Sequence, residues 1–266
     1  MLYNRPKTIL FNIIASPFFL AIPISLAIIF FLPNPTSKYK VELTQKELAD
    51  KSNSHKNFYD LNNDGIDECV MVFHNIVNGE AAIKVVTNTG INYDQWNFHG
   101  YFQKQPERYY CADLDNDGYS EIYVFYYKED SVFMGAVQPF PDKKMIFKKK
   151  FISTVWKRAG KIDFAISTIK SADIDNDGFN EMVFFLNAGF SRQPRAVFVY
   201  DHQDNSIKSS QSIGAHFVNL VIDDLDNDSF PEIYCGSSAV ANINDSLNIP
   251  YNDYSSWFIG YSNNFE

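Results

Sequence analysis

The stretch Asp113-Leu-Asp-Asn-Asp-Gly-Tyr-Ser-Glu121 determines how the rest of this 266-residue chain is interpreted. Aspartates stand at its positions 1, 3 and 5, a glycine at position 6 and a glutamate at position 9. Oxygen ligands at alternate positions converge on one point when the backbone curls tightly, and a glycine at position 6 supplies the positive φ that such a curl needs. The spacing therefore predicts a loop that binds a metal ion through oxygen atoms.

Three further copies of this loop begin at Asp60, Asp173 and Asp224, so that the motif recurs at intervals of 51 to 60 residues. Hard oxygen ligands without His or Cys favour Ca²⁺ over zinc or copper. Two copies depart from the pattern. Asn62 at position 3 lowers the ligand charge of the first loop, and Ser229 at position 6 of the last must place a Cβ in the left-handed region. We therefore expect the second and third loops to bind best. The predicted calcium ligands are Asp60, Asn62, Asp64 and Glu68; Asp113, Asp115, Asp117 and Glu121; Asp173, Asp175, Asp177 and Glu181; and Asp224, Asp226, Asp228 and Glu232.

Two other kinds of loop carry closely spaced acidic residues. An EF-hand closes its loop with a Glu at position 12, whereas position 12 here is Met71, Val124, Phe184 or Cys235. This excludes the EF-hand. The four stretches could instead be acidic turns held by their own Asp and Asn side chains. The fourfold repetition favours the metal.

The residues around the loops predict an all-β fold. Each closing Glu leads into a short β-branched and aromatic run, and aromatic residues make up 16% of the chain. These runs are 69–73, 122–126, 182–186 and 233–235, with further strand candidates at 82–87, 132–138, 145–152 and 196–200. About four strands per repeat is the size of one β-propeller blade, with the loop expected to join a strand of one blade to a strand of the next. A fifth loop would begin after residue 266, so we expect an incomplete or open propeller.

The loop motif and its period resemble the FG-GAP and VCBS calcium-loop repeats, which build seven-bladed β-propellers such as the integrin head. The resemblance covers residues from about 58 to 266 and is closer to the VCBS-like branch, because the Phe-Gly and Gly-Ala-Pro signatures are not evident. It implies that the sixteen loop residues named above hold structural calcium.

The amino-terminal segment predicts a membrane anchor. No residue between Lys7 and Lys38 is charged, and 9–32 is almost wholly apolar, which is long enough for a transmembrane helix and longer than the apolar region of a cleaved signal. We therefore expect residues 1–37 to form a cytoplasmic tail and a single span, and 38–57 to form a linker with a short helix that begins at Thr44. Open calcium sites of about 10⁻⁴–10⁻³ M suit a periplasmic or extracellular location for residues 58–266.

The net charge and the absence of catalytic motifs limit the functions that the chain can have. The formal charge of −9 disfavours a nucleic-acid partner, and 15 of the 32 acidic residues are predicted calcium ligands. No nucleophile elbow, zinc-protease motif or phosphate-binding loop is present, so we expect no enzyme activity. The predicted function is a membrane-anchored recognition, adhesion or ligand-binding module for an extracytoplasmic protein or glycan. The alternatives are the sensor domain of a longer receptor, such as a histidine kinase, and a polysaccharide-active enzyme.

Overall fold

The computed structural model describes residues 16, 19, 21–25, 55–103, 107–243, 248–262 and 265. The chain divides into two units, 1–50 and 51–266. In the first unit residues 21–25 are helical, and the described part contains no helix with the length and apolar character needed to cross a membrane. Most of the predicted anchor at 9–32 lies outside the described residues, as does the predicted helix at Thr44. The predicted linker ends earlier than expected, because residues 55–57 already belong to a strand.

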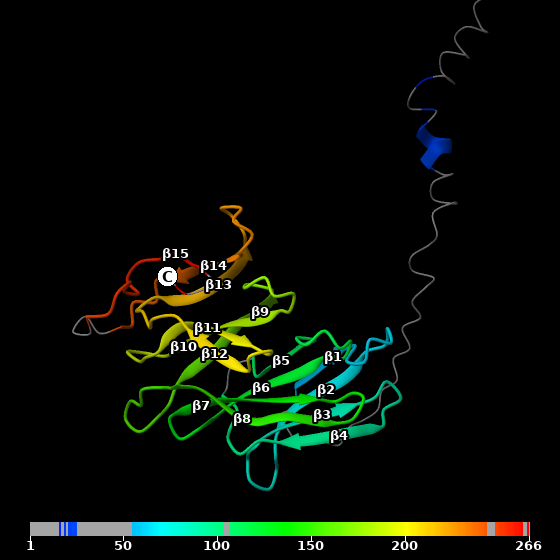
Figure 1. Ribbon diagram of the computed structural model, residues 1–266, viewed down its shortest axis with the longest axis horizontal. Coiled ribbons are helices and arrows are strands. Elements are labelled where there is room, and N and C mark those ends of the chain that lie inside the picture. The colour runs from blue at the N-terminus through cyan, green and yellow to red at the C-terminus, as the bar shows by residue number, and fades with distance from the viewer. Residues whose placement is uncertain are drawn as a thin grey trace, which may run out of the picture. The chain divides into compact units, whose positions relative to one another are not determined.

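The second unit consists of four antiparallel sheets, which confirms the all-β prediction (Figure 1). The first sheet contains β1 (His55–Tyr59), β2 (Glu68–His74), β3 (Ala81–Val86) and β4 (Asn92–Asn97). The second contains β5 (Tyr109–Ala112), β6 (Glu121–Lys128), β7 (Ser131–Gln138) and β8 (Lys144–Thr154). The third contains β9 (Phe164–Ala172), β10 (Glu181–Ala188), β11 (Arg195–Asp201) and β12 (Ser206–Ser209). The fourth contains β13 (His216–Asp223), β14 (Glu232–Ser238) and β15 (Phe258–Tyr261).

The position of the acidic loops corrects one prediction. Each loop joins the first and second strands of the same sheet, not strands of neighbouring sheets. In the second sheet, for example, Ala112 pairs directly with Glu121 across the base of the loop. The nine-residue curl reverses the chain and returns it antiparallel to the strand that it left. The strand before each loop was hard to recognise because β5 has only four residues and β9 ends in the mixed sequence Ile-Lys-Ser-Ala.

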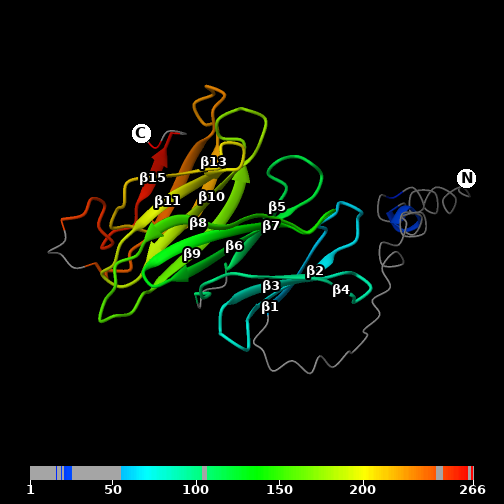
Figure 2. The same cartoon turned by 60° about the horizontal axis from the view of Figure 1, so that its bottom comes forward.

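The sheets follow one another in chain order and pack face to face (Figure 2). Counting from the closing Glu as position 0, we call the side with positions 1, 3 and 5 of the second strand the odd face and the opposite side the even face. At each interface, the even face of one sheet packs on the odd face of the next. Val70 and Val72 pack with Ile122, Val124 and Tyr126; Tyr123 and Phe125 with Met182, Phe184 and Leu186; and Val183 and Phe185 with Ile233 and Cys235.

Because both faces of their central strands are covered, the second and third sheets are the most deeply buried part of the fold. Every residue of β10 and β11 is buried. The four sheets do not close into a ring: the described residues of the first and fourth sheets share no core. The described part of the fourth sheet has three strands, whereas the others have four.

Candidate metal centre

The backbone of all four acidic loops takes the same conformation. Position 6 has a positive φ in every copy, from 76° at Ser229 to 92° at Gly178. This confirms that the serine occupies the left-handed region that glycine occupies elsewhere. Position 4 is left-handed as well, and an asparagine stands there each time, from Asn63 (57°) to Asn176 (66°). Asparagine tolerates this conformation better than most residues. Its fourfold recurrence at position 4 is a sequence signal of the loop conformation that is separate from the ligand positions.

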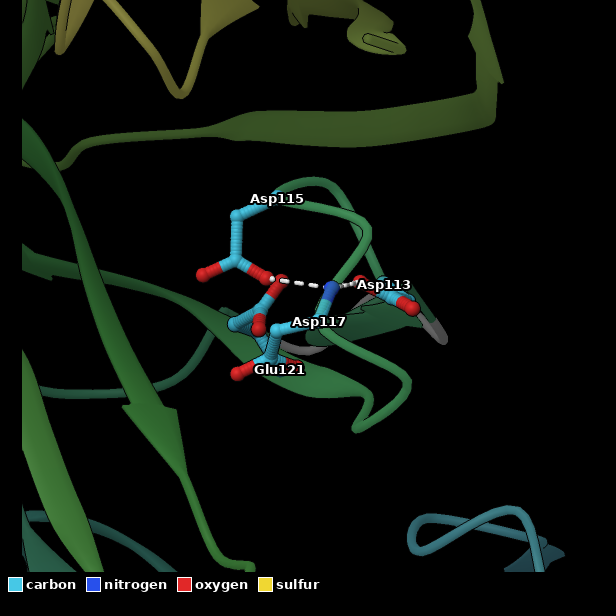
Figure 3. Close-up of side chains that lie close together, drawn as sticks. All are labelled: Asp113, Asp115, Asp117 and Glu121. Carbon is cyan, nitrogen blue, oxygen red and sulfur yellow. Dashed lines mark hydrogen bonds between the residues drawn. The ribbon is translucent and has the colours of Figure 1, made fainter.

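The second loop brings all four of its predicted ligands together (Figure 3). One oxygen from each of Asp113, Asp115, Asp117 and Glu121 lies within 4.8 Å of the others. Loop amides fix the first two carboxylates, because the Asp117 amide donates to Asp113 Oδ1 and Asp115 Oδ1, both at 3.2 Å. The Gly118 amide donates to the other oxygen of Asp113 at 2.9 Å. These bonds turn the carboxylates toward the concave side of the curl.

The closing glutamate is held in the same way in every copy. The backbone N–H at position 2 donates to its Oε2, at distances of 3.1 Å from Leu61, 3.0 Å from Leu114, 2.8 Å from Ile174 and 3.2 Å from Leu225. The glutamate is therefore bonded across the loop to the residue that follows position 1. This contact fixes the width of the loop.

Burial of Glu121 and Glu181 makes the second and third sites electrostatically unfavourable without a counter-charge. Glu121 and Glu181 are 0% and 2% exposed. Burial, together with the neighbouring loop carboxylates, raises the pKa of each to about 7. Burial also raises the pKa values of Asp115 and Asp175, with a further contribution from adjacent aspartates. A bound divalent cation would offset this repulsion and keep the carboxylates ionised. The chemistry of the donor set therefore fits a metal ion.

The four loops differ in how far their carboxylates converge. The fourth loop gathers Asp224, Asp226, Asp228 and Glu232 within 4.8 Å despite its serine, and the third gathers Asp173, Asp175 and Glu181 without Asp177. Among the described residues, the carboxylates of the first loop form no such cluster. There the Asn62 amide donates to Asp64 Oδ2 at 3.1 Å, an interaction that a carboxylate at position 3 cannot make. The structure thus contains three acidic clusters that could hold a metal. Those of the second and fourth loops are the most complete.

The residue opposite each closing glutamate further distinguishes the second and third sites. Gln138 follows Val137, the strand partner of Ile122, and its Nε2 donates to Asp117 Oδ2 at 2.6 Å and to Glu121 Oε1 at 3.5 Å. In the third sheet Asp201 follows Tyr200, the strand partner of Met182, and adds a buried carboxylate that acts on Glu181. Neither residue belongs to the nine-residue motif. Only the strand register places them at the sites.

Neighbouring loops also contact one another at the same end of their sheets. The Ser120 amide donates to the Leu61 carbonyl at 3.0 Å, and Asn116 Nδ2 donates to the Gly178 carbonyl at 3.0 Å. His202, from the turn after β11, lies 2.8 Å from the Tyr123 hydroxyl through Nδ1 and 3.9 Å from Asp115 Oδ2 through Nε2. The second site is therefore connected to the loops and turns of the sheets on either side.

The opposite end of the third and fourth sheets contains an open cavity of about 210 Å³. Its lining comes from the β8–β9, β10–β11 and β14–β15 connections and includes Arg158, Phe190, Asn242 and Tyr254. The Arg158 guanidinium lies 4.7 Å from the centre of the exposed Phe190 ring. A cation and aromatic side chains are thus exposed together, far along the strands from the acidic loops.

Comparison with known proteins yields no assignment: no family model matches the chain, and no curated protein matches its sequence. Interpretation of the acidic clusters therefore rests on the geometry described above.

Proposed function

We propose that residues 55–265 form a calcium-stabilised β-propeller segment of the FG-GAP/VCBS type, whose role is to present a recognition surface outside the cytoplasm from a membrane anchor. The observation that carries this proposal is the fourfold recurrence of one loop geometry. In every copy the closing glutamate accepts from the amide at position 2, and positions 4 and 6 have positive φ. Independent acidic turns would have no reason to repeat all three features.

Calcium is the ion that fits the donors best. The side chains offered are carboxylates and one amide, without histidine or cysteine at the ligand positions, and hard oxygen donors in a curled loop suit Ca²⁺. In this proposal calcium is structural. It holds each first hairpin in shape, while the connections at the other end of the sheets are free to carry the recognition surface. The cavity beside Arg158 and Phe190 is the part of that surface with the most suitable chemistry for a protein or glycan ligand.

The proposal is tested by thermal unfolding of the full chain, purified in a mild detergent, in calcium and in EDTA. We expect a higher midpoint in calcium, and the difference should shrink when Asp115 and Asp175 are both replaced by Ala. The matched control is Asp142→Ala with Asp204→Ala, which removes two exposed turn carboxylates outside the loops. This control should keep the full calcium response.

Metal identity is measured on the same samples by adding magnesium or zinc in place of calcium. Stabilisation by calcium at lower concentration than by magnesium, and none by zinc, is the expected order. Equal midpoints with calcium and with EDTA would remove the basis of the proposal.

A further inference from the structure

The three interfaces between the sheets share one packing pattern, and one face of the first sheet and one face of the fourth take no part in it. Each sheet offers its even face to the odd face of the sheet that follows. The even face of the fourth sheet and the odd face of the first sheet belong to none of the three cores of the described residues. One of these faces is even and the other is odd, which is the combination found at each internal interface.

The even face of the fourth sheet is apolar and exposed. Val221, Tyr234 and Gly260 lie side by side across it, and Phe258 lies in the adjacent row. Val221 is 51% exposed and Phe258 75% exposed, although both are in strands. The Tyr234 and Phe258 rings are stacked at 5.6 Å with only 10° between their planes. Tyr234 stands at position 2 after its closing glutamate, as does Tyr123, which in the second core packs against Tyr200 of the next sheet.

The odd face of the first sheet has the apolar residues expected of a partner. Phe58, Cys69 and Val86 lie in one row, and Phe58 is 64% exposed. Met71, two residues further along β2, lies between Lys56 and Lys84 in the next row and is itself buried. Cys69 directly follows its closing glutamate. The residues at the same place in the other three sheets, Ile122, Met182 and Ile233, contribute to the three cores.

The charges beside the two apolar faces are opposite in sign. Lys56 and Lys84 flank Met71 on the first sheet, while Asp223 and Glu232 are paired at the loop end of the fourth sheet. Lys56 and Asp223 are both exposed. Opposite charges across an interface favour the pairing of unlike faces, and like charges disfavour the pairing of a face with itself. A partner that carries the first-sheet face is therefore favoured over one that carries a second fourth-sheet face.

From this pattern we propose that the chain associates with a second copy of itself, head to tail, with the even face of the fourth sheet of one copy packed on the odd face of the first sheet of the other. The interface is heterologous, because each copy contributes a different surface. It extends the packing rule of the three internal cores across the boundary between two molecules. The inference does not depend on what the cavity binds.

Cysteine cross-linking of the full chain in mild detergent tests this arrangement, because Cys69 already lies on one of the two faces. Val221→Cys places a thiol on the other face and leaves the Tyr234–Phe258 stack intact. With a short bismaleimide we expect a covalent species of twice the chain mass. The species should disappear when Cys69→Ser is added to the same variant. Val77→Cys, in the 93% exposed β2–β3 turn outside both faces, is the matched control and should give no species of twice the chain mass.

The mass of the unmodified chain, measured by sedimentation in the same detergent, provides a second reading. A dimer or larger assembly that dissociates on Phe258→Asp is expected, with the calcium response of the thermal midpoint retained. A single-chain mass without the cross-linked species would overturn the proposal. Cross-linking that persists after Cys69→Ser would overturn it as well, because it would show that two fourth-sheet faces pair with each other.

Discussion

Arg195 Nη1 lies 3.0 Å from Asp253 Oδ2, and both side chains are fully buried. The same arginine donates to the carbonyls of Ala188 and Gly214, while Asp253 accepts from the amides of Asn242 and Ile243. The pair therefore joins the start of β11 to the long β14–β15 connection. It supports the backbone that lines the cavity between the third and fourth sheets.

We expect Asp253→Ala to lower the free energy of unfolding by about 3–5 kcal/mol, because it leaves a buried guanidinium without its counter-charge. Chemical denaturation measures the change. Asp204→Ala, at an exposed turn position, should alter stability by less than about 0.5 kcal/mol. Equal effects of the two substitutions would show that the buried pair has no special role in stability.

The fourth loop should gain stability from Ser229→Gly. Ser229 has a φ of 76°, a conformation that costs a residue with a Cβ about 1–2 kcal/mol. The greater freedom of glycine in the unfolded chain offsets about 0.4–1 kcal/mol of this, so the expected net gain is about 0.5–1 kcal/mol. Urea unfolding measures it.

Gly118→Ser provides the converse of that substitution in the second loop. A Cβ on Gly118 would meet no atom within 4 Å, so any loss of stability reports backbone conformation and not crowding. We expect a loss of similar size. Stabilisation by the serine would contradict the explanation based on φ.

Stability without metal should depend on pH through two of the closing glutamates, Glu121 and Glu181. Their folded-state pKa is raised from 4.5 to about 7, so the folded protein binds these protons more tightly than the unfolded chain does. Their contribution is fully present below pH 4.5 and is lost as the pH rises to about 7. Thermal midpoints in metal-free buffer between pH 5 and 8 should fall less steeply in the Glu121→Gln, Glu181→Gln double variant. Excess calcium should reverse the dependence, since the ion binds the ionised carboxylates. Identical slopes for the double variant and the unmodified chain in metal-free buffer would exclude this assignment.

Asp201→Asn in the third site and Gln138→Ala in the second should have different effects on the thermal midpoint. Removal of the buried carboxylate beside Glu181 relieves repulsion, so the metal-free midpoint should rise and the calcium-induced increase should become smaller. Gln138→Ala at the equivalent place in the second sheet removes the donor to Asp117 and should not raise the metal-free midpoint. A lower metal-free midpoint for Asp201→Asn would indicate that this carboxylate stabilises the site through bonds such as that from the Asp204 amide.

The sequence was sufficient to predict the strands that follow the loops, because each runs from a closing glutamate into a buried apolar segment such as 182–186. It also predicted that Ser229 would take a left-handed conformation. Pattern alone could not assign the strands before the loops, since a four-residue strand such as β5 has little periodicity. The roles of Gln138 and Asp201 were not predictable either. They depend on which residue faces the closing glutamate across the sheet, and register is a property of the folded hairpin.

Because each acidic loop connects two strands that are adjacent in the chain, the contacts that shape it span few residues: Leu114 and Glu121, for example, are separated by only seven positions. Closing so short a segment costs little chain entropy, and such low contact order favours early formation during folding. The packing of one sheet on the next, in contrast, joins residues about one repeat apart. Under the calcium proposal, each hairpin with a carboxylate cluster would therefore be able to bind its ion as an independent unit, before the cores between the sheets exist. The order of ion loading would then follow the order in which the hairpins become available to the solvent.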